Sequence, residues 1–203
     1  MPRITQARAQ MRRRQIIEAA LNCFARLGFH KTTMQDIVKQ SNLSPGAIYC
    51  HFASKHAIIV AVVEERHHHE SELVRRASRN ANFASAFNEL VRNFISVLGN
   101  SEERAWRRLT IQLWAESLHD RRLAAAVRQG VDEPRAMLAA IVRRAKSRGE
   151  LPQALNDDAT ARLLIGVFQG LVLQNAWDAE VDTGACAEAL ATLIGRSVAG
   201  ARS

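Results

Sequence analysis

The sequence predicts an all-α protein of about nine helices, in which three short helices are joined by a long fourth helix to a larger helical body. Gly and Pro together number only 14 among 203 residues, and aromatic residues make up 5%. Apolar residues recur at helical spacing along the chain, without the alternation that strands require. With 47% apolar and 24% charged residues, the composition is that of a globular protein.

The first helix is predicted over residues 11–27, where apolar side chains repeat every three to four positions until Gly28 ends it. A second, two-turn helix follows Thr33, whose hydroxyl is expected to cap it. Asp36 stands three residues later and completes the capping pattern. Asn42 then permits a turn, because asparagine tolerates left-handed backbone.

The third helix is predicted over residues 45–51, with Ser44 as its N-cap and Pro45 at its first position. Ser54 is expected to cap the long fourth helix, which becomes polar after residue 63. The body contains the remaining helices, punctuated by glycines and one proline. They are expected at Phe83 to Leu98, Ser101 to Leu118 with Asn100 as cap, Arg121 to Ser147, Asp157 to Trp177, and Thr183 to Ala199.

Positive charge is concentrated at the N-terminal end of the chain. Residues 1–56 hold nine Lys or Arg against two acidic residues, which is +7 of the net charge of +8. The rest of the chain holds 19 basic and 18 acidic residues. A polyanion such as nucleic acid is therefore the expected partner of this end only. Arg12, Arg13 and Arg14 form either an ordinary solvated face or a phosphate or minor-groove contact.

Several other classes of protein are disfavoured. The N-terminus has no apolar segment typical of a signal peptide, and no run approaches the roughly 20 apolar residues of a membrane span. A cytoplasmic protein is expected. Cys23, Cys50 and Cys186 are odd in number and widely spaced, so neither disulfides nor a zinc site is indicated, and no cofactor is expected.

Two short helices separated by a tight turn predict a helix-turn-helix, whose second helix enters the major groove of DNA. Small residues at Gly46 and Ala47 let the start of this helix approach bases and phosphates closely. Tyr49, His51 and Lys55 supply donors for flanking phosphates.

The segment "TTMQDIVKQSNLSPGAIYCHFASKHAII" resembles the helix-turn-helix of the TetR family of transcriptional regulators. The matching positions are Thr33, Ile37, Leu43, Ser44, Gly46, Ile48, Tyr49, His51, Phe52, Ser54 and Lys55. Asn42 replaces the usual turn glycine, and Val38 and Ser41 replace alanine. The resemblance covers about residues 12–60, although "RGELPQALNDDATARLLIGVFQGLVLQ" is also similar to the family's dimer-forming region.

The resemblance implies a set of DNA-binding residues. Ala47 and Cys50 are expected at base edges, and Phe52 in the small core. The whole set is Thr33, Ser44, Pro45, Gly46, Ala47, Tyr49, Cys50, His51 and Lys55. Double-stranded operator DNA is the implied partner.

The resemblance also implies an effector pocket in the body. Apolar stripes in this part of the chain are more often core than cavity, so each residue has two interpretations. The expected ligand-binding set is Phe94, Trp106, Gln112, Leu113 and Trp114. Its composition favours a small hydrophobic or weakly polar effector of unknown identity.

The helix from Asp157 carries apolar residues on more than one face, with Gly166 and Gly170 forming a small-residue stripe. A helix that is apolar on two faces must bury both, and a second subunit would cover one of them. The predicted homodimer interface is Leu163, Leu164, Val167, Phe168, Leu171, Leu190, Leu193 and Ile194. A two-fold dimer in turn predicts a palindromic operator.

The sequence thus predicts a DNA-binding domain over residues 1–56 and a ligand-binding and dimerisation domain over residues 57–203. The expected function is that of a ligand-responsive regulator of transcription, most often a repressor in this family. One alternative is a DNA-binding protein of the same fold that has no inducer and acts through a protein partner or many chromosomal sites. An enzyme that uses Glu116, His119 and Asp120 is disfavoured, because no nucleophile, metal or phosphate-loop motif accompanies them.

Overall fold

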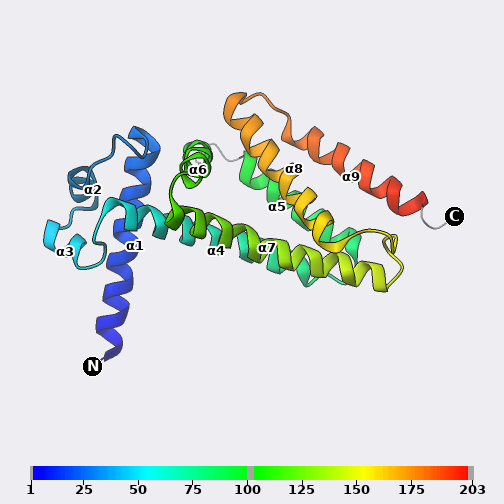
Figure 1. The fold of residues 1–203 in the computed structure, drawn as a ribbon, viewed down its shortest axis with the longest axis horizontal. Coiled ribbons are helices and arrows are strands. Elements are labelled where there is room, and N and C mark those ends of the chain that lie inside the picture. Colours follow the sequence, from blue (N-terminus) through cyan, green and yellow to red (C-terminus); the bar gives the residue numbers. More distant parts are fainter. Residues whose placement is uncertain (1, 100–102, 201–203) are drawn as a thin grey trace. The chain divides into compact units, whose positions relative to one another are not determined.

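The computed structural model describes residues 2–99 and 103–200, and these residues form nine α-helices without any strand (Figure 1). This confirms the predicted all-α fold. The helices are α1 (Pro2–Leu27), α2 (Met34–Ser41), α3 (Pro45–Tyr49), α4 (Lys55–Ser78), α5 (Phe83–Gly99), α6 (Glu103–Ser117), α7 (Arg121–Ser147), α8 (Asp157–Trp177) and α9 (Thr183–Gly200).

The chain divides into two compact units. Unit 1 comprises Met1–Arg66 and Arg108–Val127, and unit 2 comprises His67–Arg107 and Arg128–Ser203. Helices α4, α6 and α7 each begin in one unit and end in the other. The predicted boundary at residue 56 separates a DNA-binding domain from a ligand-binding domain, whereas these units are defined by their compactness. The predicted boundary therefore stays a prediction.

Unit 1 is built on α1, against which α2 packs, with α3 following after a turn (Figure 1). Gly28 ends α1 with φ at +80°, a conformation that favours glycine. The core is aliphatic and aromatic, and Phe52 belongs to it as predicted. Its largest buried side chains include Ile16, Phe24, Ile37, Ile48, Phe52, Ile58, Ile59, Leu109, Leu113 and Leu123.

Among the described residues, the start of α1 and the end of α3 are the helix boundaries that differ most from the predicted ones. Helix α1 begins at Pro2 rather than at residue 11, because the segment between them consists mostly of residues with high helix propensity and has no breaker after the proline. Helix α3 ends at Tyr49, because the N–H groups of His51 and Phe52 both donate to the carbonyl of Ile48 and close the last turn. The predicted cap Asn100 lies outside the described residues.

Unit 2 has its core between α5 and α7, with side chains of α8 and α9 packed against it. The buried residues of this core are Phe83, Ala86, Phe87, Leu138, Ala139, Ile141, Val142, Ala145, Leu151 and Ala161. No described helix combines the length and the apolar character that a membrane crossing requires.

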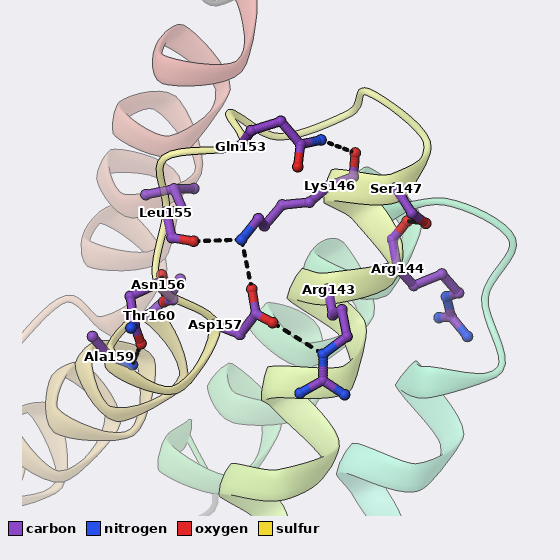
Figure 2. Close-up of polar contacts among 10 residues, drawn as sticks. All are labelled: Arg143, Arg144, Lys146, Ser147, Gln153, Leu155, Asn156, Asp157, Ala159 and Thr160. Carbon is purple, nitrogen blue, oxygen red and sulfur yellow. Dashed lines mark hydrogen bonds and ion pairs between the residues drawn. The ribbon is translucent and has the colours of Figure 1, made fainter.

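Ion pairs hold the start of α8 on α7 (Figure 2). Lys146 Nζ lies 2.9 Å from Asp157 Oδ1, and Arg143 Nε donates to Asp157 Oδ2 over 3.0 Å. Lys146 also donates to the carbonyl of Leu155, while Asn156 caps α8 by accepting from the N–H of Ala159. The hydrogen bonds from Lys146 and Arg143 hold the pKa of the Asp157 carboxyl below its usual value.

Candidate nucleic-acid interface

The turn between α2 and α3 is fixed by local hydrogen bonds and one left-handed residue. Asn42 has φ at 54°, and its neighbour Ser44 caps α3 by accepting from the N–H of Ala47 at 3.3 Å. Pro45 occupies the first position of α3, where a missing N–H leaves no hydrogen bond unmade. These features confirm the local structure expected for the turn. The start of α3 is therefore held firmly in place.

One face of α3 is buried and the other is open to solvent. Ile48 is fully buried against the core of unit 1, whereas Tyr49 is 53% exposed and Cys50 is exposed beside it. Gly46 is exposed too, and a Cβ built on it would meet no atom within 4 Å. The fold itself therefore does not require glycine at this position.

Thr33 forms the predicted capping box at the start of α2. Its hydroxyl donates to Asp36 Oδ2 at 2.7 Å, and the N–H of Asp36 donates to the Thr33 hydroxyl at 3.2 Å. The side-chain and backbone hydrogen bonds from Thr33 lower the pKa of the Asp36 carboxyl. Thr33 thus has a clear structural role, and its contact with DNA stays a prediction.

Lys55, predicted to contact a phosphate, makes intramolecular contacts. Its Nζ donates to the carbonyls of Phe29 at 2.8 Å and His30 at 3.2 Å, and lies 4.6 Å from the centre of the Phe29 ring. Partial burial lowers the pKa of the Lys55 ammonium. The side chain ties the start of α4 to the loop after α1, while one ammonium hydrogen is left for a further acceptor.

Two histidines contact carboxylates at the corner between α6 and α7, all within unit 1. His56 Nε2 lies 2.7 Å from Asp120 Oδ2, and His30 Nε2 lies 3.2 Å from Glu116 Oε2. The contact between His56 and Asp120 is an ion pair when the imidazole is protonated. Sequence reasoning missed both pairs, since no local pattern links residues so far apart.

Asp120 also caps α7, because its Oδ1 accepts from the N–H groups of Leu123 at 2.9 Å and Arg122 at 2.8 Å. The bond from Leu123 is the main cause that lowers the pKa of the Asp120 carboxyl, with His56 adding to it. Asp120 thus caps a helix and contacts His56, and Glu116 contacts His30.

The predicted ligand-binding residues fall in different units. Phe94 and Trp106 belong to unit 2, where the Phe94 ring lies 4.7 Å from that of Phe168. Gln112, Leu113 and Trp114 belong to unit 1. Leu113 is buried in its core, and Gln112 Oε1 lies close to Gly28 at the end of α1. The structure therefore does not gather the five residues within one compact unit.

Two neutral amide side chains of unit 2 each hold a buried atom that makes no hydrogen bond to any described protein atom. These atoms are Asn93 Nδ2 on α5 and Asn175 Oδ1 on α8, and Asn175 is only 7% exposed. A buried amide without a partner is unfavourable by about 1–3 kcal/mol, so each of these groups requires a partner such as an ordered water or a ligand. Both residues interrupt apolar helical stripes, and this is the sequence signal that can identify them.

The predicted dimer residues on α8 and α9 divide into two groups. Leu163, Val167 and Leu193 are exposed, as is Trp177 at the end of α8. A Cβ on Gly166 or Gly170 would meet no atom within 4 Å. The other predicted residues are at least partly covered by this chain itself. Leu164, Leu190 and Ile194 pack on the core of unit 2, Phe168 contacts Phe94, and Leu171 is buried.

Among the described residues, no group of three or more His, Cys, Asp or Glu side chains is placed to hold a metal ion. A helix-turn-helix with an open recognition helix, in a unit that carries most of the net positive charge, defines a DNA-binding regulator of transcription.

Comparison with known proteins identifies the family. Residues 16–62 match the model of bacterial regulatory proteins of the tetR family, and residues 85–199 match the C-terminal model of BetI-type transcriptional repressors. The chain belongs to the TetR family of transcriptional regulators. Because members of this family are regulators of transcription, the enzyme alternative is excluded.

Individual relatives agree with this assignment over nearly the full length. The HTH-type transcriptional regulator UidR of Escherichia coli K12 is 27% identical over 190 residues, covering 94% of each chain. The structure of Salmonella enterica GusR is 28% identical with a TM-score of 0.73, covering 92% of this chain and 95% of that one. Bacillus subtilis FadR, solved in complex with stearoyl-CoA, is 19% identical with a TM-score of 0.75, covering 91% and 98%.

Proposed function

We propose that this TetR-family regulator is a cytoplasmic homodimeric repressor, which a small hydrophobic or weakly polar effector releases from a palindromic operator. The observation that carries the DNA-binding part is the open face of α3. Gly46 meets no protein atom that a side chain would displace, and Tyr49 and Cys50 are exposed beside it. A glycine that the fold does not require is explained by the close approach of DNA.

The roles of the individual side chains follow from their positions. Ala47 and Cys50 contact base edges and set sequence preference, whereas Tyr49 and His51 contact phosphates. Thr33 and Ser44 position the two helices as caps. The Ser44 hydroxyl also donates to the backbone of DNA from its exposed site, whereas the hydroxyl and N–H of Thr33 both donate to Asp36, so Thr33 acts by holding the start of α2 beside the DNA. Lys55 fixes the loop after α1 and contributes positive charge nearby.

The effector is proposed to bind in unit 2, against the Phe94 and Phe168 rings and Trp106. Aromatic walls bind an apolar body, while Asn93 Nδ2 and Asn175 Oδ1 offer one donor and one acceptor to a weakly polar group. The two amides are neutral, so they suit a weakly polar group of the effector. The complex of Bacillus subtilis FadR with stearoyl-CoA provides precedent on this fold for a ligand that carries a long apolar chain.

A second copy of the chain is proposed to cover the exposed residues of α8 and α9. Leu163 and Val167 would lie in the interface with the open stripe of Gly166 and Gly170, which lets two helices approach closely. Two-fold symmetry then presents two α3 helices to successive half-sites.

Release follows from coupling between the two sites. Helix α4 begins in unit 1 and ends in unit 2, so a shift of its second half reaches the DNA-binding unit. If the effector weakens DNA binding by a given factor, DNA weakens effector binding by the same factor. Titration calorimetry of the effector with free protein and with the DNA complex measures both sides of this relation.

In vitro selection of binding sites from a random duplex library tests the DNA-binding proposal without knowledge of the operator. We expect the full chain to enrich an inverted repeat, and a Cys50→Ala variant to enrich an altered repeat. Failure of the wild-type chain to enrich any sequence would contradict the proposal. Thermal-shift screening of apolar and weakly polar compounds, followed by release from the selected duplex, then tests the effector.

A further inference from the structure

The first turns of α1 extend beyond the part of the chain that the family model matches. That match begins at residue 16, and Ile16 is also the first fully buried side chain from residue 6 onward. Residues 6–11 are all exposed, and Met11 is 67% exposed. In Figure 1 this end of α1 projects past α2 and α3. Packing within unit 1 therefore does not explain why these turns are present.

Charge distinguishes this extension from an ordinary frayed helix end. Residues 1–17 contain five arginines and no acidic residue, and the first acid in the chain is Glu18. Arg8 and Arg12 are like charges four residues apart, which destabilises a helix, and an isolated helix of this length is only marginally stable in water. An anionic partner would remove the first of these disadvantages and supply the contacts that the extension lacks.

One face of the extension is continuous with the helix-turn-helix. Arg8, Arg12 and Gln15 follow the spacing that places side chains on one side of a helix. Arg12 Nη1 lies 3.3 Å from Gln15 Oε1, and Gln15 Nε2 donates over 2.8 Å to the carbonyl of Ser41. Ser41 is the last residue of α2, directly before the turn into α3. The arginines thus continue outward from the turn itself.

We propose that the Arg8–Arg12 face of α1 is a second DNA-contacting surface, which binds phosphates of the duplex that flanks the site of α3. The inference rests on the proposed function, because it requires α3 to occupy the neighbouring major groove. DNA held there carries its backbone past the turn at Ser41, where the arginine row begins. Guanidinium groups suit this task, since they stay charged and form paired hydrogen bonds with phosphate.

The length of the extension sets the reach of the contact. From Gln15 back to Pro2 the helix spans about 20 Å at a rise of about 1.5 Å per residue. This corresponds to about six base pairs at about 3.4 Å each. Flanking DNA within about six base pairs of the half-site is therefore the segment that this surface contacts.

The test combines a variant with trimming of the DNA. Fluorescence anisotropy measures affinity of the full chain for a selected duplex that either keeps or lacks six flanking base pairs on each side. Arg8→Gln is compared with Arg14→Gln, which removes an equally exposed charge about 120° away around the same helix. Glutamine keeps helix propensity close to that of arginine, and far-UV circular dichroism confirms that each variant is folded.

We expect Arg8→Gln to weaken binding about two- to five-fold per protomer at physiological salt, and to reduce the salt slope by about 0.9 per protomer. Trimming should weaken wild-type protein and Arg14→Gln, but it should have little further effect on Arg8→Gln. Arg8→Lys should restore the slope, because it keeps the charge.

Two results would overturn the inference while the proposed function stands. One is specific binding by the wild type with equal salt slopes for Arg8→Gln and Arg14→Gln. The other is equal sensitivity of wild type and Arg8→Gln to trimming. If the wild-type chain instead prefers no DNA sequence at all, the proposed function fails and this inference fails with it.

Discussion

Gly46 illustrates at the level of a single residue how stability and function separate. A Cβ on Gly46 meets no atom within 4 Å, and its φ does not require glycine. A glycine that the fold requires has surroundings that leave no room for a side chain. At Gly130 on α7, for example, a Cβ would lie 1.8 Å from Nδ1 of His67, so the imidazole ring of His67 fills the space that a side chain would need.

This contrast gives a first prediction. Gly46→Ala should keep or raise the melting temperature, because alanine is favoured over glycine in helices by up to about 1 kcal/mol. It should nevertheless weaken DNA binding by about 1–3 kcal/mol, because the added methyl group separates the helix from DNA. Thermal melting and anisotropy measure the two effects. Gly130→Ala is the control and should lower the melting temperature, and unchanged DNA affinity of Gly46→Ala would exclude close approach at this position.

Lys55 gives a second prediction at this scale. Lys55→Ala removes the donor to two loop carbonyls, so it should destabilise the protein by about 1–2 kcal/mol. If Lys55 also binds a phosphate, the salt slope of DNA binding should fall by about 0.9 per protomer. An unchanged melting temperature would contradict the structural role of Lys55 in holding the loop. An unchanged salt slope would show that Lys55 does not bind a phosphate.

The residues of the helix-turn-helix could be predicted because their signals are local. Thr33 with Asp36, Asn42, and Ser44 with Pro45 each act within four positions of the chain, and all were predicted with the conformations observed. The pairing of His56 with Asp120 could not be predicted, because it depends on how α4 and α7 pack.

At the level of elements, the predicted α7 and α8 have the observed bounds, while α1 is nine residues longer than predicted. Caps and breakers mark the ends of α7 and α8, such as Asn156 before α8. The segment before Met11 has helix-forming residues but no apolar face, and apolar periodicity is what the prediction relied on. Apolar periodicity also could not predict the contacts of Asp157 with α7, because these depend on how the two helices pack.

Those contacts predict a dependence of stability on pH. The pKa of Asp157 is lowered in the folded protein, first by the hydrogen bond from Lys146 and then by that from Arg143. The stabilisation is therefore present above the ordinary aspartate pKa of about 3.9, and it is lost as the pH falls through the lower folded value. Asp157→Asn should lower the melting temperature at pH 7, and the difference from wild type should shrink below about pH 4.

Glu188→Gln is the matched control for this measurement. It removes an exposed carboxylate of α9 that has no ion pair within the described structure. Its melting temperature should follow that of the wild type across the pH range. A gap between wild type and Asp157→Asn that stays constant down to pH 2 would show that the ion pairs with α7 are not its cause.

For the whole molecule, the sequence predicted a head, a long connecting helix and a helical body. It did not predict that α6 and the start of α7 would divide between the two compact units. Glu116 contacts His30 and Asp120 contacts His56 only because the chain returns to unit 1 after α5. For the same reason, the five predicted ligand residues are divided between the units, although all five lie on the two consecutive helices α5 and α6.

The proposed dimer gives the prediction for this scale. Leu163 is 70% exposed on α8, and its burial by a second copy would contribute about 1.5–3 kcal/mol per copy. Leu163→Glu should therefore shift the protein from dimer to monomer in sedimentation velocity and weaken operator binding. Leu118→Glu is the control, because Leu118 is 81% exposed at the corner between α6 and α7. Equal sedimentation of both variants and the wild type would place the interface elsewhere or exclude a dimer.

The most direct test of the central claim is an anisotropy titration with DNA from upstream of the protein's own gene, with a scrambled duplex as the comparison, across a range of salt. The account predicts tight binding to one duplex only, saturation at two protomers per site, and affinity that falls steeply as salt increases. Upstream DNA without an operator can be replaced by the selected duplex. Weak binding to both the selected and the scrambled duplex, without preference, would contradict a sequence-specific dimeric regulator.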